Sequence, residues 1–322
     1  MNIHAPANQA HRFDEQTSAM APDVVDGLSR QPKQLSPKYF YDAAGSELFE
    51  QITQLPEYYP TRTELGILRK QASEIAGSAP SGAALVEFGA GATTKARLLL
   101  NQQTFLAYVP VDISADFLAG QASVLRRDFP RLDVYPVAAD FTASFALPEA
   151  VEGLPKVGFF PGSTIGNFEP HEACAFLRRT RELLGPNAQM IVGVDLEKDE
   201  RVLHAAYNDA AGVTASFNLN LLVRINRELG GNFDLGAFTH RAIYNRERHR
   251  IEMHLISTKS QTVRLLGRNL SFRRGESIHT ENSYKYSIER FTALVRGAGW
   301  RVLKSWADDE GMFSVHTLVG SD

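Results

Sequence analysis

The stretch Leu85-Val-Glu-Phe-Gly-Ala-Gly-Ala-Thr-Thr-Lys95 decides the fold. The apolar run Ala84–Phe88 predicts a buried strand, the turn Gly89-Ala-Gly91 follows it, and Thr93–Leu100 has a helical pattern. The two glycines allow the backbone to approach a ligand closely, and the start of a helix offers unpaired N–H groups. This order of strand, turn and helix indicates a site for a nucleotide-type cofactor.

The glycine spacing narrows the choice of cofactor. Thr94 stands where the third glycine of a G-x-G-x-x-G dinucleotide fingerprint would be, which disfavours a nicotinamide dehydrogenase. No G-x-x-x-x-G-K-[ST] phosphate loop is present. A strand that ends in E-x-G-x-G, followed by a second strand that ends in Asp112, is typical of methyltransferases that use S-adenosylmethionine.

Strand and helix patterns alternate from residue 84 to residue 195. This alternation predicts an α/β fold with a doubly wound, Rossmann-like parallel sheet and helices on both faces. The expected strands are Ala84–Phe88, Leu106–Val111, Asp133–Val137, Lys156–Phe160 and Met190–Val194, and the expected helices are Thr93–Leu100, Ala115–Asp128 and Pro170–Leu184. Ligands bind such sheets beyond the carboxyl ends of the strands.

The alternation of strand and helix patterns ends after Asp195. Helical patterns are followed by alternating, β-branched segments between residues 242 and 272, and the chain ends in an expected antiparallel hairpin, 301–319. Residues 1–30 have a weak pattern, and residues 32–62 are rich in aromatic and turn residues. We therefore expect a cofactor domain of residues 63–195 plus 286–322. A second, smaller α+β substrate lobe would comprise residues 1–62 plus 196–285.

Composition excludes several classes of protein. The 322 residues are 43% hydrophobic and 22% charged, as in ordinary globular proteins. A formal net charge of −3 without a long Lys/Arg run argues against nucleic-acid binding. No apolar stretch reaches the roughly 18 residues of a membrane helix, and residues 1–20 lack the apolar centre of a secretory signal. With Cys174 as the single cysteine, an internal disulfide is excluded, and we expect a cytoplasmic enzyme.

The predicted strand ends supply candidate cofactor residues. Gly89 and Gly91 would let the cofactor approach, and Asp112 could accept both ribose hydroxyls, although it could equally cap the following helix. Asp140 could accept from the adenine amine while Phe141 stacks nearby, or the pair could form an ordinary turn. Lys95 could face the carboxylate of the methionine moiety or simply be solvated.

The segment Gly162-Ser163-Thr-Ile-Gly-Asn167 closes the fourth strand, where a methyl acceptor would bind. Asn167 could orient an amine by accepting its N–H, and the alternative is a glycine-rich turn. The tyrosines Tyr41, Tyr58, Tyr59 and Tyr207 could attract a quaternary ammonium product by cation–π interaction, or they could be core residues.

Glu281 and Ser283 could hold an imidazole N–H, or they could belong to an exposed loop. The histidines show neither H-x-x-x-H nor H-E-x-x-H spacing, so we expect no metal site.

Several longer strings carry a family resemblance from about residue 30 to the end. The chain resembles the histidine-specific Nα-methyltransferases of ergothioneine biosynthesis. The matching segments are P37-K-Y-F-Y-D, G45-S-E-L-F, Q51-I-T-Q-L-P-E-Y-Y-P-T-R62, V-E-F-G-A-G, F160-P-G-S-T-I-G-N-F168, V194-D-L-E-K-D199, A206-Y-N-D-A-A-G-V-T-A-S-F-N218, I225-N-R-E-L229 and R250-I-E-M-H-L255. The family turn usually reads E-L-G-S-G rather than E-F-G-A-G, and the segment after Glu281 reads N-S-Y-K-Y rather than V-S-C-K-F.

The resemblance implies a sheet domain that binds S-adenosylmethionine and a lobe that closes over L-histidine, which would be trimethylated to hercynine. It implies that Tyr41 and Tyr58 contact the substrate, that Asn167 holds the α-amine, and that Tyr207 contacts the carboxylate. It also implies that Met253, Glu281 and Ser283 contact the imidazole. The cofactor positions that it implies are Gly89, Lys95, Asp112, Asp140 and Phe141, and Gly91, Gly162 and Ser163 lie in the matching turns.

Two alternatives stay open at this point. The chain could methylate the α-amine of a different amino acid, or it could be a binding module that senses S-adenosylmethionine without catalysis. We expect a monomer that takes a small amino-acid substrate and binds neither nucleic acid nor membrane.

Overall fold

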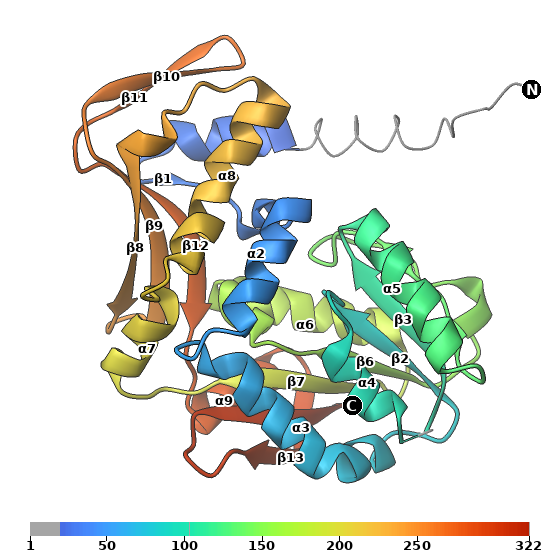
Figure 1. The fold of residues 1–322 in the computed structure, drawn as a ribbon. Coiled ribbons are helices and arrows are strands. Elements are labelled where there is room, and N and C mark those ends of the chain that lie inside the picture. Colours follow the sequence, from blue (N-terminus) through green and yellow to red (C-terminus); the bar gives the residue numbers. More distant parts are fainter. Residues whose placement is uncertain (1–19, 103, 322) are drawn as a thin grey trace, which may run out of the picture. The chain divides into compact units, whose positions relative to one another are not determined.

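The computed structural model describes residues 20–102 and 104–321 (Figure 1). The chain divides into two compact units. Within the described residues, unit 1 comprises residues 20–52, Tyr207–Ile243 and Glu252–Glu281, and unit 2 comprises Thr53–Ala206, Tyr244–Ile251 and residues 282–321. Residues 53–62, 196–206, 244–251 and 282–285, which the sequence analysis placed in the substrate lobe, therefore belong to unit 2.

Unit 2 is built on one large sheet, and the predicted doubly wound α/β fold is confirmed. The strand order is β13-β14-β7-β6-β2-β3-β4, with β5 also paired to β3. The strands are β2 (Ala83–Phe88), β3 (Phe105–Asp112), β4 (Asp133–Val134), β5 (Val137–Ala138), β6 (Lys156–Phe160), β7 (Gln189–Asp195), β13 (Trp300–Ala307) and β14 (Phe313–Gly320). The strands from β7 to β4 pair in parallel, and β14 and β13 add the expected antiparallel hairpin at one edge.

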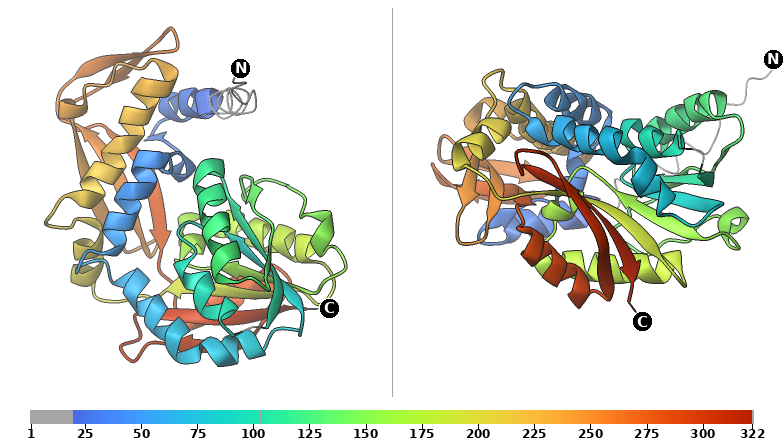
Figure 2. Two further views of the ribbon diagram at one scale, coloured as in Figure 1. Left: turned by 45° about the vertical axis from the view of Figure 1, so that its right-hand side comes forward. Right: turned by 90° about the horizontal axis from the view of Figure 1, so that it is seen from below.

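Helices cover both faces of this sheet (Figure 2). They are α3 (Tyr59–Gly77), α4 (Thr94–Leu100), α5 (Ala115–Asp128), α6 (Pro170–Leu184) and α9 (Ile288–Gly297). One apolar core joins alternate β2 residues such as Val86 to Phe176 of α6 and Phe291 of α9. The opposite core joins Leu85 to Leu68 of α3 and Leu99 of α4. Because β2 is buried on both sides, its sequence is apolar at every position except Glu87 and does not alternate.

Unit 1 combines helices with most of a four-stranded sheet. The sheet order is β1-β12-β9-β8, and the boundary between the units falls within its three long strands. Its strands are β1 (Lys33–Gln34), β8 (Phe238–Asn245), β9 (Arg250–Ser257) and β12 (Ser277–Tyr284), and β10 (Gln261–Leu265) pairs separately with β11 (Arg268–Phe272). The helices are α2 (Ala43–Thr53) and α8 (Val213–Leu229), while α7 (Glu200–Tyr207) ends at the start of unit 1.

The described part of residues 1–30 differs from the weak pattern predicted for it. Residues 20–29 are helical, and Met20, Val24 and Leu28 are buried at a four-residue spacing. The part of the expectation that concerns residues 1–19 lies outside the described residues. Helix α2 was not predicted, and the expected strand Asp133–Val137 is two short strands, β4 and β5. No helix among the described residues is long and apolar enough to cross a membrane.

Candidate active site

The glycine turn after β2 has the conformation that the sequence requires. Gly89 and Gly91 have φ angles of +75° and +45°, a region that side chains with a Cβ rarely adopt. Gly89 N donates to Val111 O at 2.8 Å, which ties the turn to the end of β3. A Cβ built on Gly91 would meet nothing within 4 Å, so the turn borders open space. The predicted close approach of a ligand therefore has room at this position.

Asp112 lies at the carboxyl end of β3 and faces this turn. Its Oδ2 accepts from Gly91 N at 3.2 Å and its Oδ1 accepts from Ser114 N at 2.9 Å. Burial raises the pKa of Asp112 above its usual value, although these backbone donors oppose the shift. Each carboxylate oxygen can accept more than one hydrogen bond, so both can also accept from ligand hydroxyls. The turn-capping and ligand-binding interpretations of Asp112 are therefore compatible.

Lys95 is held at the same edge of the sheet by a residue that the sequence analysis missed. Glu64 of α3 is completely buried, and its Oε2 lies 2.6 Å from Lys95 Nζ. Gly162 N donates to both oxygens of Glu64 at 3.0 and 2.9 Å. A Cβ on Gly193 would lie 2.0 Å from Glu64 Oε1, so only glycine leaves space for this carboxylate. The buried Glu64 thus links the helix that bears Lys95 to the turn after β6.

Asp140 and Phe141 follow β5 at the next strand end. Asp140 Oδ1 accepts from Thr142 N at 2.8 Å and forms a local turn. The Phe141 ring centroid lies 5.7 Å from that of Phe160, and Phe141 Cε1 lies 3.4 Å from a Cβ built on Gly89. The predicted pair is therefore brought to the glycine turn by packing of the Phe141 ring.

The turn after β6 carries the candidate for binding the substrate amine. Ser163 is in the left-handed region with φ 57°, and the short helix η3 (Thr164–Asn167) follows it. A Cβ on Gly166 would lie 2.8 Å from Tyr284 O, so glycine lets the turn pack on that backbone. The Asn167 side chain is half-buried, and its amide has no hydrogen-bond partner among the described residues. An amide in this position has both its donors and its acceptor available to a ligand.

A buried ionic network supports this turn. Asp195 N donates to Ser163 Oγ at 2.9 Å, and the Asp195 carboxylate accepts from Lys285 and Lys198, each at 2.6 Å. Tyr59 OH donates to the same carboxylate at 2.8 Å. Burial alone would raise the pKa of Asp195, but the two ammonium groups hold it below its usual value. Burial lowers the pKa of Lys198 to about 8. The sequence analysis named Tyr59 but did not predict this network.

Lys285 also reaches a predicted substrate residue. Its Nζ donates to Ser283 Oγ at 2.7 Å, and the side chain of Lys285 is fully buried. Ser283 is therefore held by a buried cation and is not part of an exposed loop.

Asn282 and Tyr284, which differ from the family pattern on either side of Ser283, have hydrogen-bond partners in unit 2. Tyr284 OH donates to Glu169 Oε2 at 2.6 Å, and Arg250 donates to the tyrosine oxygen at 2.8 Å. Asn282 Nδ2 donates to Glu169 Oε1 at 3.3 Å. Asn282 and Tyr284, the positions at which this segment departs from the family pattern, therefore both bind the same carboxylate, that of Glu169.

The remaining residues that the sequence predicts to bind substrate are divided between unit 1 and unit 2. In unit 1, Tyr41 packs edge-on against Phe49 and Phe217 with ring centroids 5.8 Å apart in each case. Tyr207 is buried and its carbonyl contacts His240 Nε2 at 2.8 Å, while Met253 on β9 is buried and Glu281 on β12 is half-buried. Tyr58 of unit 2 is buried directly before α3.

The chain is similar to several known proteins. Residues 20–319 match the family model described as "Histidine-specific methyltransferase, SAM-dependent". The histidine N-alpha-methyltransferase of Mycolicibacterium smegmatis is 40% identical over 95% of this chain and 96% of its own length. That of Mycobacterium tuberculosis is 40% identical over 92% and 94%. Among solved structures, the CcbJ methyltransferase from Streptomyces caelestis aligns with a TM-score of 0.46 and 15% identity, covering 79% of this chain and 90% of its own.

The chain belongs to the family of histidine-specific, S-adenosylmethionine-dependent methyltransferases. It is an enzyme, and its cofactor is S-adenosylmethionine. The residues at the carboxyl edge of the sheet fit this cofactor. The turn at Gly91 borders open space, and Asp112 has oxygens that can accept hydroxyls.

Proposed function

We propose that this enzyme transfers three methyl groups in succession to the α-amine of L-histidine and so makes hercynine, a step of ergothioneine biosynthesis. Family membership supports the reaction class. The observation that carries the acceptor chemistry is Asn167, a half-buried amide without a partner among the described residues. It follows β6, at the same sheet edge as the glycine turn and Asp112.

The chemistry needs little more than positioning. S-adenosylmethionine supplies the methyl group, and a carbon–nitrogen bond forms as the carbon–sulfur bond breaks and S-adenosylhomocysteine leaves. Asn167 accepts an N–H of the substrate and so leaves the nitrogen lone pair directed at the methyl carbon. Asparagine takes no proton, and the amine loses its proton to water before attack. Holding two reactants in line can contribute on the order of 7–11 kcal/mol.

We propose cofactor roles for the edge residues of unit 2. Asp112 accepts from the two ribose hydroxyls, and Asp140 with Phe141 binds the adenine. Lys95, held by Glu64, faces the methionine carboxylate. The turn residues Gly89, Gly91, Gly162 and Ser163 give the cofactor backbone access.

The substrate roles follow the resemblance, residue by residue. Tyr41 and Tyr58 contact the amino acid, and Tyr207 contacts its carboxylate. Met253 packs on the imidazole, while Glu281 accepts the imidazole N–H. Ser283, fixed by Lys285, contacts the other nitrogen.

A comparison of the twenty amino acids as substrates tests the proposal directly. The enzyme is incubated with S-adenosylmethionine labelled in the methyl group and, separately, with each of the twenty amino acids. We expect histidine to gain three methyl groups in sequence, detected by mass spectrometry, with no comparable gain for the others. Preferred methylation of a different amino acid would overturn the substrate, and binding of the cofactor without any turnover would overturn the catalytic role. A cytoplasmic location and a monomeric state stay predictions from the sequence.

A further inference from the structure

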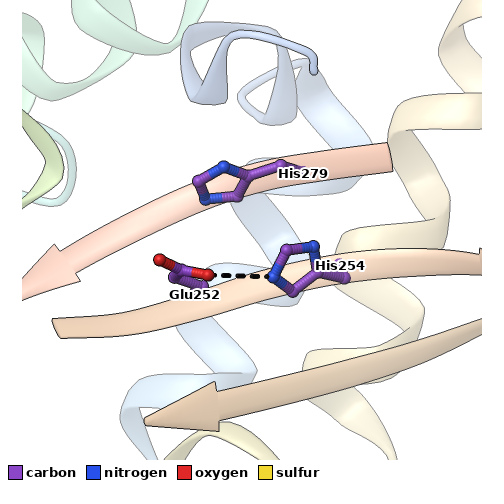
Figure 3. Close-up of side chains that lie close together, drawn as sticks. All are labelled: Glu252, His254 and His279. Carbon is purple, nitrogen blue, oxygen red and sulfur yellow. Dashed lines mark hydrogen bonds and ion pairs between the residues drawn. The ribbon is translucent and has the colours of Figure 1, made fainter. Parts of the chain in front are cut away.

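Three side chains of unit 1 converge on one point between β9 and β12. They are the Glu252 carboxylate and the His254 and His279 imidazoles, and Figure 3 shows the three groups facing one another. One candidate ligand atom from each lies within 4.8 Å of the other two. Glu252 and His254 are two residues apart on one strand, so they share a face of the sheet, and His279 comes from the neighbouring strand.

The distance between Glu252 and His254 resembles that between neighbouring ligand atoms of a tetrahedral metal ion. His254 Nε2 lies 3.3 Å from Glu252 Oε2, which is long for a hydrogen bond to a carboxylate. Zinc–nitrogen and zinc–oxygen bonds of about 2.0–2.2 Å place neighbouring ligand atoms about 3.3–3.5 Å apart. The Glu252–His254 pair therefore already has this spacing, and a candidate ligand atom of His279 lies within 4.8 Å of one from each of them.

The cluster is largely buried. The other ring nitrogen of His254, Nδ1, is also buried and has no hydrogen-bond partner among the described residues. The side chains of His254 and Glu252 are 16% and 11% exposed. These two candidate ligands are therefore largely shielded from water.

We propose that Glu252, His254 and His279 bind a divalent transition-metal ion, with zinc as the best fit, and that this ion joins β9 to β12. Two imidazoles and one carboxylate are a typical zinc set that leaves a fourth position for water. Magnesium and calcium prefer sites made only of oxygen ligands and are not expected to bind. The expectation of no metal site rested on helical histidine spacing, whereas these ligands come from two strands.

Zinc titration of the tag-free, full-length chain tests the proposal. We expect one zinc ion per chain by calorimetry, a higher melting temperature with zinc, and visible absorption typical of tetrahedral coordination when cobalt(II) replaces zinc. Magnesium at the same concentration should produce none of these changes. Absence of stoichiometric zinc binding would overturn the site.

Three variants locate the ion. Glu252→Gln and His279→Asn keep similar shapes and should each weaken zinc binding about 100-fold or more, since loss of even an outer partner costs 10–100-fold. His249→Asn is the matched control, because His249 Nδ1 also faces a glutamate, Glu197 Oε1 at 2.8 Å, but lies in unit 2. Its zinc affinity should equal that of the wild type. If neither Glu252→Gln nor His279→Asn changes the affinity in a folded protein, the ion binds elsewhere and the assignment is wrong.

Discussion

Replacing Asp195 by asparagine should destabilise unit 2 severely. The Asp195 carboxylate accepts from Lys285 and Lys198 at 2.6 Å each, and the side chains of Asp195, Lys285 and Lys198 are 1%, 0% and 7% exposed. Asparagine has the same shape, but it removes the negative charge that both ammonium groups contact. It also replaces one acceptor oxygen by an NH₂ group that faces a donor.

The magnitude follows from the burial. Breaking a buried ion pair by removing one partner costs about 3–5 kcal/mol, because the remaining charge is left uncompensated. A loss of this size lowers the melting temperature of a protein of more than about 150 residues by roughly 6–20 °C. Thermal and urea unfolding, followed by circular dichroism, measure both quantities.

Asp199→Asn is the matched control. It makes the same chemical change four residues later, where Asp199 and its partner Arg201 are 47% and 91% exposed. Solvent screens such pairs, so its stability should stay close to that of the wild type. Adding Lys198→Met to Asp195→Asn removes one of the two uncompensated cations and should restore part of the loss. The reasoning is refuted if Asp195→Asn is as stable as Asp199→Asn.

Four further predictions concern the cofactor, the substrate and pH. Asp112→Ala should weaken S-adenosylmethionine binding by about 1.5–3 kcal/mol, through loss of charged hydrogen bonds, and an unchanged calorimetric affinity in the folded variant would rule out ribose binding. Glu281→Ala should lower kcat/KM for histidine far more than for an apolar amino acid of similar size, and an equal loss for both would make Glu281 structural. Asn167→Ala should slow methylation of histidine more than methylation of its dimethylated intermediate, which has fewer N–H groups, and equal slowing of every step would argue for a role in the turn alone. Because the pKa of Lys198 is lowered to about 8 in the folded protein, the unfolded chain binds more protons than the folded chain between about pH 8 and pH 10.5. The free energy of unfolding of the wild type, compared with that of Lys198→Met, should therefore rise with pH in this range. Parallel pH profiles of the two proteins would contradict this.

The sheet and its ligand edge could be predicted from the sequence, because their signals are local. An apolar run that ends in glycines or an acid reports a buried parallel strand, whatever the rest of the chain does. The helix α2 was missed for the opposite reason. It contains Gly45, whose missing Cβ would otherwise lie 1.7 Å from Phe40 O, so the residue that weakens the helical pattern is required by tertiary packing.

The supporting side chains could not be predicted, because their partners are far apart in sequence. Lys285 is separated from Asp195 by 90 residues and Gly162 from Glu64 by 98. Nothing in their local sequence distinguishes them from solvated charges. The sequence also does not predict the environment of Glu87, in the E-F-G-A-G string. Its carboxyl group lies inside the sheet and accepts a hydrogen bond from Tyr108 OH. Burial raises the pKa of Glu87 to about 8.

The network around Lys285 gives a physical reason for selecting an imidazole, if the proposed function holds. An ammonium group only donates, so the Ser283 oxygen that faces Lys285 at 2.7 Å must accept. The hydroxyl proton of Ser283 is therefore directed away from Lys285, and we propose that Ser283 donates it to the imidazole. A carboxylate such as Glu281 meets it as an acceptor. A neutral imidazole has one lone-pair nitrogen and one N–H, which match this donor and this acceptor respectively. An apolar side chain offers neither an acceptor to Ser283 nor a donor to Glu281, and a site built to hydrogen-bond its substrate discriminates against such side chains.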